Sequence, residues 1–197
     1  MNTVNSRSPV NDIISLSRLD PILASHHHVF FYFSKYKDSP FSSERITIEV
    51  SKKNLNHEKI EEIISSLDAS EELSVLSKIN VNGTIYHLPM IDFLSKKRSS
   101  KSIDLSYELS HAWNMNLNIY DSGRSIHAYG THLLTLSQWI KFMGYLLLLN
   151  EKSGEKVIDV RWIGHRLMSG FASLRITNNS GRHKYSPKYI GSTLFNI

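Results

Sequence analysis

Hydrophobic and polar positions along this 197-residue chain follow two different periods, which predicts a mixture of strands and helices. Strands are expected where residues alternate in polarity or are rich in β-branched and aromatic types. These segments are residues 29–33, 45–50, 78–81, 84–92, 117–120, 125–129, 156–160 and 171–177. Asn82 and Gly83 form a dipeptide typical of tight hairpins and separate residues 78–81 from 84–92.

Apolar residues at helical spacing predict helices over residues 13–23, 56–67, 70–76, 102–113 and 135–150, and residues 161–168 are helical or irregular. The helix over 135–150 has the clearest signal, because Thr135 and Gln138 form a capping-box pair before a dense apolar stretch. The chain lacks the glycine-rich turn of a dinucleotide-binding fold. We therefore expect an α+β fold with a mostly antiparallel sheet flanked by helices.

Length and composition predict one globular domain over residues 1–197. Within it we distinguish an N-terminal α/β part over residues 1–80, a part over 80–180 that carries the candidate chemistry, and a tail over 181–197. The absence of cysteine excludes disulfides, zinc ribbons and thiol catalysis. The N-terminus does not resemble a signal peptide, and the longest apolar stretch, residues 145–149, is too short to cross a bilayer. We expect a cytoplasmic protein with no membrane contact.

Candidate chemistry lies in three segments that are far apart in the sequence. Asp92 and Asp159 each end a short apolar run, where a carboxylate is costly to bury unless it is paired or binds metal. Ser125 and His127 follow a turn at Gly123 and point to one face of the expected strand. Carboxylates hold divalent cations, while hydroxyl, imidazole and backbone amide groups hold phosphate. If the three segments meet, they form a metal-and-phosphate site.

Each of these groups also has an ordinary structural interpretation. Asp92 and Asp159 are equally suited to cap the turn or helix that follows them. The serine–histidine pair fits a polar strand that faces solvent. Arg166 and Arg175 could hold phosphate through their guanidinium groups, although an arginine taken singly more often forms a surface ion pair.

The chain carries a formal net charge of +5 and has a pI of about 9.3, which favours polyanions without requiring them. Its basic residues cluster after the two aspartates. The first cluster is Lys96, Lys97, Arg98 and Lys101, and the second is Arg175, Arg182, Lys184 and Lys188. We expect nucleic-acid contacts here, and the alternative is a pair of solvated loops.

The ordered set of motifs resembles the archaeo-eukaryotic primase superfamily, the primase-polymerases. That family has an apolar strand ending in Asp-x-Asp or Asp-x-Glu, then a small-x-His motif, then a late apolar-Asp motif. The matching segments here are Met90-Ile91-Asp92, Ser125-Ile126-His127 and Val157-Ile158-Asp159. Residues 122–129 and 167–175 resemble the family's turn before the histidine and its arginine-bearing segment. The resemblance covers residues 80 to 180 and is nearest to small bacterial primase-like proteins.

The resemblance implies an RRM-like catalytic module that binds nucleic acid, DNA rather than RNA, and a nucleoside triphosphate. The reaction would be metal-assisted attack of a 3′-hydroxyl on an α-phosphate. By this resemblance, Asp92 and Asp159 would bind Mg²⁺ or Mn²⁺. Together with His127 they would also be the catalytic groups. The implied nucleotide contacts are Ser125, His127, Arg124, Arg166 and Arg175. The short format suggests an accessory protein in a mobile-element or phage-defence setting, with a protein partner encoded nearby.

One position departs from the family pattern. The second acid of the first motif would stand at position 94, where this chain has Leu94, and Asp121 or Asp104 would have to compensate. Fewer carboxylates give weaker binding of divalent cations. Three hypotheses therefore stay open: a nucleotidyltransferase, a binding module on the same fold for nucleic acid or a partner protein, and a metal-dependent phosphoesterase.

Overall fold

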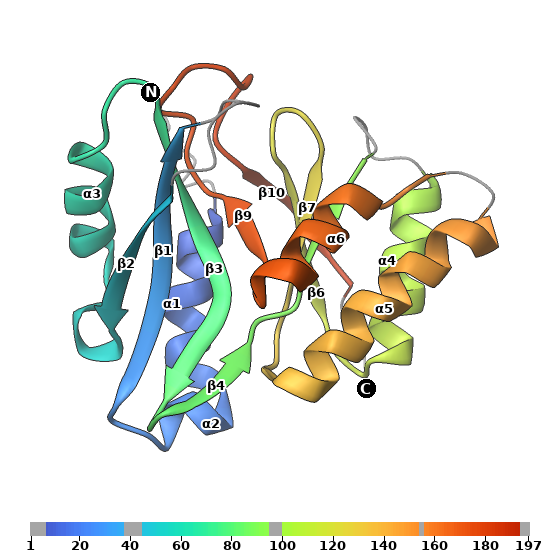
Figure 1. The fold of residues 1–197 in the computed structure, drawn as a ribbon, viewed down its shortest axis with the longest axis horizontal. Helices are drawn as coiled ribbons and strands as arrows, with labels where there is room; N and C mark the ends of the chain where they lie inside the picture. The colour runs from blue at the N-terminus through green and yellow to red at the C-terminus, as the bar shows by residue number, and fades with distance from the viewer. Residues whose placement is uncertain (1–6, 38–44, 95–99, 154–155, 194–197) are drawn as a thin grey trace.

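The computed structural model of the protein describes residues 7–37, 45–94, 100–153 and 156–193. It shows an α+β fold in which two antiparallel sheets stand side by side with helices around them (Figure 1). The predicted fold class is therefore confirmed, although the strands divide between two sheets rather than one. No helix within the described ranges is long and apolar enough to cross a membrane.

The first sheet has the strand order β2-β1-β3-β4-β8, with β9 pairing with β3. Its strands are β1 (Val29–Lys37), β2 (Arg45–Ser51), β3 (Glu71–Val81), β4 (Thr84–His87), β8 (Leu134–Thr135) and β9 (Ser173–Arg175). Asn82 and Gly83 both adopt positive φ and form the predicted hairpin between β3 and β4.

Strand β3 replaces the helix that we predicted over residues 70–76, so that prediction is wrong. β3 is almost continuously buried from Glu72 to Ser77 because β1, β4 and β9 pair with it and side chains pack on both of its faces. A strand buried on both faces carries a run of apolar residues without alternation. Because apolar residues occur without alternation here, Leu73 and Leu76 happen to have the i, i+3 spacing that is typical of a helix.

The second sheet has the order β10-β6-β7-β5. Its strands are β5 (Met90–Phe93), β6 (Leu117–Asp121), β7 (Ile126–Gly130) and β10 (Lys188–Ser192). The single strand predicted over 84–92 is thus two strands in different sheets. Pro89 lies at the break, because proline has no N–H to continue a ladder. The N–H of Gly130 donates to the Pro89 carbonyl at 2.9 Å, which joins the crossover to β7.

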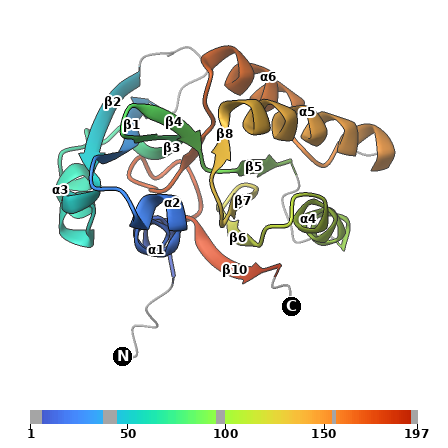
Figure 2. The same ribbon diagram turned by 90° about the horizontal axis from the view of Figure 1, so that it is seen from below.

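Six α-helices lie around the sheets in the described residues: α1 (Pro9–Leu19), α2 (Pro21–Ala24), α3 (His57–Ser65), α4 (Ser100–Ala112), α5 (Leu136–Ser153) and α6 (Val160–Ser169), with a short 3₁₀ helix at Lys52–Asn54. Helices α1 to α3 lie on one side of the first sheet, and α5 and α6 lie on the other side of the molecule, toward the second sheet (Figure 2).

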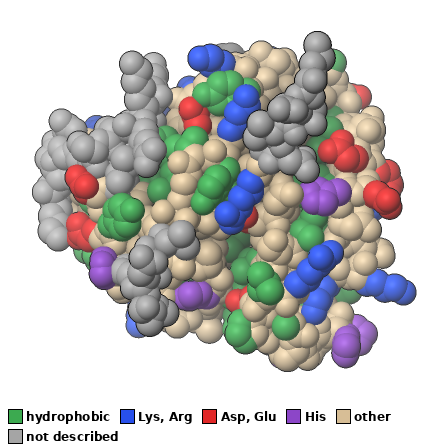
Figure 3. All heavy atoms as spheres, turned by 180° about the vertical axis from the view of Figure 1, so that it is seen from behind, with side chains coloured by type: hydrophobic (Ala, Val, Ile, Leu, Met, Phe, Trp, Pro, Cys, Tyr) green, Lys and Arg blue, Asp and Glu red, His purple; other side chains and the backbone are tan. Residues whose placement is uncertain are grey.

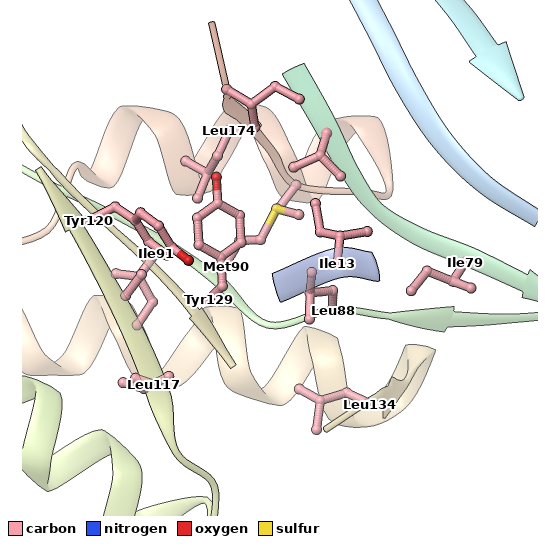
Figure 4. Close-up of a cluster of buried hydrophobic side chains, with 14 of the residues drawn as sticks. Ile13, Ile79, Leu88, Met90, Ile91, Leu117, Tyr120, Tyr129, Leu134 and Leu174 are labelled. Atoms are coloured by element: carbon pink, nitrogen blue, oxygen red, sulfur yellow. The ribbon is translucent and has the colours of Figure 1, made fainter. Parts of the chain in front are cut away.

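The hydrophobic core continues from one sheet to the other. Figure 4 shows side chains from α1, β3, β5, β6, β7 and β9 meeting in one cluster around Met90 and Tyr129. Trp139 and Phe142 of α5 are buried, as the sequence predicts. Each large apolar side chain contributes about 1.5–3 kcal/mol when fully buried. This shared core fixes the two sheets against each other and so fixes the groups at their junction.

Candidate functional site

The end of β5 and the start of α6 bring two aspartates together. The N–H of Leu94 donates to the Val157 carbonyl at 2.8 Å, and the N–H of Asp159 donates to the Asp92 carbonyl at 3.2 Å. The residues between these two bonds form an isolated antiparallel bridge. Asn150, at the end of α5, holds the same segment, because its side-chain oxygen accepts the N–H of Val157 at 2.8 Å.

Asp159 caps the N-terminus of α6, which is the ordinary structural role that the sequence predicts for it as an alternative to metal binding. Its Oδ1 accepts the backbone N–H groups of Arg161 at 2.9 Å and Trp162 at 3.1 Å. The same side chain also lines the cavity that contains Asp92. The structural and the functional interpretations of Asp159 are therefore compatible.

The serine–histidine motif lies beside Asp92 on the neighbouring strand. The β5–β7 register places Asp92 opposite His127. Ser125 Oγ donates to Asp92 Oδ1 at 3.1 Å, and His127 Nε2 lies 3.8 Å from the same oxygen. Hydroxyl, imidazole and carboxyl thus form one contiguous group.

The pKa of Asp92 is raised to about 7, mainly because the surrounding protein desolvates the carboxyl. The hydrogen bond from Ser125 opposes this rise, whereas the negative charge of Asp159 adds to it. The positive charges of Arg124 and Arg166 lower the pKa by smaller amounts. Desolvation therefore outweighs the hydrogen bond and the two guanidinium charges that favour the ionised carboxylate.

Burial, aided by the charges of Arg175 and His183, lowers the pKa of His127 to about 3. The imidazole is therefore neutral at physiological pH. Only 6% of His127 is exposed, and its Nδ1 has no hydrogen-bond partner among the described residues. A buried ring nitrogen without a partner costs free energy, which a ligand in the cavity can recover.

All of these groups line one cavity of about 420 Å³ between the two sheets. The first sheet contributes Tyr36, Arg45, Ser173, Leu174 and Arg175; the second sheet and its turn contribute Asp92, Phe93, Leu94, Ser122, Arg124, Ser125 and His127; α6 and the C-terminal segment contribute Asp159, Trp162, Arg166 and His183. The described lining holds four guanidinium groups and two carboxylates. With neutral histidines, its formal charge is therefore positive, which suits an anionic ligand.

Two of the arginines, Arg166 and Arg45, repel each other inside this cavity. Burial lowers the pKa of Arg166, and the like charge of Arg45 lowers it further. Arg166 Nε is buried with no hydrogen-bond partner among the described residues. Arg45 lies over the ring of Tyr36, 4.5 Å from its centroid, and donates to Ser173 Oγ at 3.3 Å. A phosphate group between the two guanidiniums would reduce this repulsion.

Arg175 lies in the cavity wall and braces the turn that precedes His127. The side chain is buried and donates to the backbone carbonyls of Ser122 and Thr177. Asp121 supports the same turn, because its Oδ1 accepts the N–H of Gly123 at 2.8 Å and its Oδ2 accepts the Tyr185 hydroxyl at 2.7 Å. In this structure Arg175 therefore holds the turn between β6 and β7 in place.

A third carboxylate does not join the two aspartates in the described lining. Neither Asp121 nor Asp104 lines the cavity, and Leu94 lies at its wall with 42% of its surface exposed. Across the residues that the structure describes, no group of three histidine, cysteine, aspartate or glutamate side chains is arranged to hold a metal ion.

The predicted nucleic-acid contacts lie in part outside the described residues. Lys96, Lys97 and Arg98 fall within 95–99, and the side chain of Lys101 is likewise outside them. Arg182 and Lys184 are exposed on the segment that packs against the turn at Gly123. The sequence analysis missed Tyr36, Arg45 and Trp162, because they belong to no motif and two of them come from the first sheet.

One comparison with known proteins gives a match. The model of a family of archaeo-eukaryotic primase-like proteins, described as "Archaeo-eukaryotic primase 1D-like", matches residues 51–188. The match covers more than two thirds of the chain and includes all three motif segments. No curated protein and no solved structure matches the chain.

Proposed function

Because this chain belongs to the archaeo-eukaryotic primase-like family, we propose that its cavity binds a nucleoside triphosphate with a divalent cation and serves nucleotidyl transfer to a nucleic-acid 3′-hydroxyl. One observation supports this proposal above the others. Three motif segments from distant parts of the sequence line one cavity, together with four arginines. A triphosphate is an anion that such a lining would attract.

Asp92 and Asp159 suit one divalent cation, which members of this family generally use. Carboxylate oxygens are preferred ligands of Mg²⁺ and Mn²⁺, and Mg²⁺ commonly takes one or two carboxylates with water and substrate phosphate. The cap bonds of Asp159 use Oδ1, so the second carboxylate oxygen remains available as a ligand. The bound ion would neutralise phosphate charge and polarise the phosphoryl group under attack.

The other lining residues would position the nucleotide. Ser125 and His127 offer a hydroxyl and a neutral imidazole beside the two carboxylates. Arg166 and Arg124 supply charge for the β- and γ-phosphates. Trp162, also in the lining, offers an aromatic surface to the base or sugar.

A second candidate function is nucleotide binding without transfer, and Leu94 favours it. Two metal ions bridging the attacking and leaving oxygens need several carboxylate ligands. The leucine at the cavity wall leaves two carboxylates in the described lining, a set that suits one ion better than two.

Calorimetric binding of dATP and ATP with Mn²⁺, followed by primer extension on a labelled template, tests both candidates. Arg166→Gln should weaken nucleotide binding at least about tenfold, because a charged hydrogen bond contributes about 1.5–3 kcal/mol. Arg161→Gln, an exposed arginine on the same helix, is the matched control. Asp92→Asn should abolish extension while the protein stays folded.

The two measurements separate the candidates. Nucleotide binding with an extension product that depends on Asp92 supports transfer. Nucleotide binding without product, in Mg²⁺ and Mn²⁺ and with deoxy- and ribonucleotides, supports the binding module. Absence of nucleotide binding in the wild-type protein contradicts both.

A further inference from the structure

Aromatic and cationic side chains gather on the first sheet next to the cavity. The ammonium of Lys78 lies 4.7 Å from the ring centroid of Tyr32 and 4.8 Å from that of Phe171. The guanidinium of Arg45 lies 4.5 Å from the centroid of Tyr36. We call these five residues the aromatic–cation strip.

The strip lies on the face of the sheet that points away from the core. Along β1, Phe31 and Phe33 are buried in the core, while Tyr32 and Tyr36 alternate with them and are partly exposed. Helices α1 and α3 cover the core side of β1, β2 and β3, and the described helices leave the other side open except for α6 near β9 (Figures 1 and 2). The rings of Tyr32, Tyr36 and Phe171 are all partly exposed.

The strip is continuous with the proposed nucleotide site. Tyr36 and Arg45 line the cavity, whereas Lys78 and Tyr32 lie elsewhere on the same sheet and Phe171 lies just before β9. Tyr32 and Tyr36 are four residues apart on one face of β1, about 13 Å at the rise of a strand. A chain of two or three nucleotides would span this length, as bases do on other open sheets that carry aromatic side chains.

We propose that the aromatic–cation strip binds a single-stranded nucleic acid and leads it to the cavity, an inference that rests on the proposed function. Bases stack on the rings of Tyr32 and Phe171, while Lys78 and Arg45 contact phosphates. Stacking on aromatic side chains is largely independent of base sequence and needs unpaired bases. A duplex keeps its bases stacked inside the helix and therefore gains little from these rings.

One further observation fits this ligand. Tyr32 is hydrogen-bonded to Glu49 and Asn80 on the adjacent strands, so its ring is held in place before any ligand arrives. The opposite face of the molecule shows lysine, arginine, acidic and histidine side chains intermixed (Figure 3). Cation–ring pairs also occur elsewhere, such as Arg7 over Tyr189 and Lys188 over Tyr185, so what sets the aromatic–cation strip apart is that Tyr36 and Arg45 also line the cavity.

Fluorescence anisotropy with a labelled dT₁₂, the matching rU₁₂ and a duplex of equal length tests the proposal on the full chain. Tyr32→Ala and Phe171→Ala should each weaken single-strand binding about 5- to 100-fold, the range measured for loss of one stacking ring. Tyr32→Phe keeps the ring and should retain affinity. Tyr107→Ala, an exposed tyrosine on α4, is the matched control.

A second pair of variants tests the phosphate contact. Lys78→Ala should lower single-strand affinity and reduce the slope of log K against log salt by about 1. Lys141→Ala, an exposed lysine on α5, should leave both unchanged. Circular dichroism checks the fold. If Phe171→Ala unfolds, Phe171→Leu replaces it, because leucine keeps apolar volume without the ring.

The outcomes separate this proposal from the preceding one. Three results would overturn the proposed role of the strip: both ring variants bind the single strand as tightly as the wild type, Tyr107→Ala loses as much affinity as they do, or the duplex binds equally well. Any of these would assign this face of the sheet to another use, such as a protein contact. Nucleotide affinity is measured separately with dATP and Mn²⁺. Loss of single-strand binding in the ring variants supports the strip even where the cavity binds no nucleotide.

Discussion

At the scale of single residues, the cavity holds ionisable groups that lack water to solvate their charges. Burial raises the pKa of Asp92 and lowers those of His127 and Arg166. Buried nitrogens of His127 and Arg166 have no hydrogen-bond partner among the described residues. A ligand that brings both phosphate and a divalent cation complements the arginines and the carboxyls together. For this reason we favour a nucleotide with metal over an uncharged ligand.

The leucine at position 94 gives a direct test of the cation site. Leu94→Glu should tighten Mn²⁺ binding about tenfold, because a third carboxylate adds a negative ligand at the cavity wall. Leu94→Gln has nearly the same shape without the charge and should bind Mn²⁺ like the wild-type protein. Titration of Mn²⁺ by electron paramagnetic resonance measures the affinity directly. Equal affinity in the two variants would show that the Leu94 position does not face the ion.

A buried histidine away from the cavity predicts a pH dependence of stability. His87 is stacked on Trp139 with ring centroids 4.6 Å apart, and burial, aided by the charge of Lys78, lowers its pKa to about 4. In the unfolded chain this pKa is about 6.5, so the unfolded state binds more protons between pH 6.5 and 4. The stabilisation is complete above pH 6.5 and is lost as the pH falls toward 4.

The size of this effect follows from the two pKa values. Between pH 7 and pH 5 the wild-type protein should lose about 2 kcal/mol of unfolding free energy more than His87→Gln does. Urea denaturation at both pH values measures the difference. His165→Gln, at an exposed position, should behave like the wild-type protein. A wild-type loss no larger than that of His87→Gln would mean that this imidazole does not titrate as inferred.

At the scale of elements, local signals predicted well wherever the structure depends on neighbouring residues. The Asn82–Gly83 hairpin and the helix that begins near Thr135 form as expected, because turn and cap chemistry act within a few residues. The predictions failed where distant strands decide the outcome. Residues 71–76 belong to a strand buried on both faces, and residues 84–92 divide between two sheets at Pro89.

The turn between β6 and β7 also provides a prediction at the scale of elements. Gly123 has φ +82°, and a Cβ there would lie 2.9 Å from the Tyr185 carbonyl oxygen. Gly123→Ala should lower the unfolding free energy by at least about 2 kcal/mol, through backbone strain and this close approach. It should also weaken nucleotide binding, because the turn carries Arg124 and Ser125 into the cavity.

Gly181→Ala is the matched control for this turn. Gly181 also has positive φ, at +68°, yet no atom lies within 4 Å of the position of a Cβ. It should therefore cost only the backbone strain, about 1 kcal/mol. Urea unfolding and dATP calorimetry of both variants compare the two costs. Equal destabilisation of the two variants would contradict a role for the contact with Tyr185.

At the scale of the whole molecule, the cavity takes its walls from both sheets, and this could not be predicted from sequence. The motifs at Asp92, His127 and Asp159 were recognisable because each is a short local pattern. Tyr36 and Arg45 come from the first sheet, at least 45 positions before the first motif. Only the packing of one sheet against the other brings them to the site.

Ligand binding should consequently stabilise the molecule as a unit. With dATP and Mn²⁺ at about 100 times Kd, the unfolding free energy should rise by about 2.7 kcal/mol. For a chain of this length, that corresponds to an increase in Tm of about 5–10 °C. Thermal unfolding followed by circular dichroism measures the shift, and Arg166→Gln should reduce it at the same ligand concentration. An unchanged Tm in the wild-type protein at these concentrations would argue against binding.

Asp159 both caps α6 and lines the cavity, so the residue at this position is informative in other members of this family. Asparagine and serine also begin helices well, so a chain with either residue there would keep α6 and its overall shape. It would nevertheless lose a negatively charged oxygen in the proposed nucleotide site. Identity at this single position could therefore sort members that have kept ion-dependent chemistry from equally well-folded members that have abandoned it.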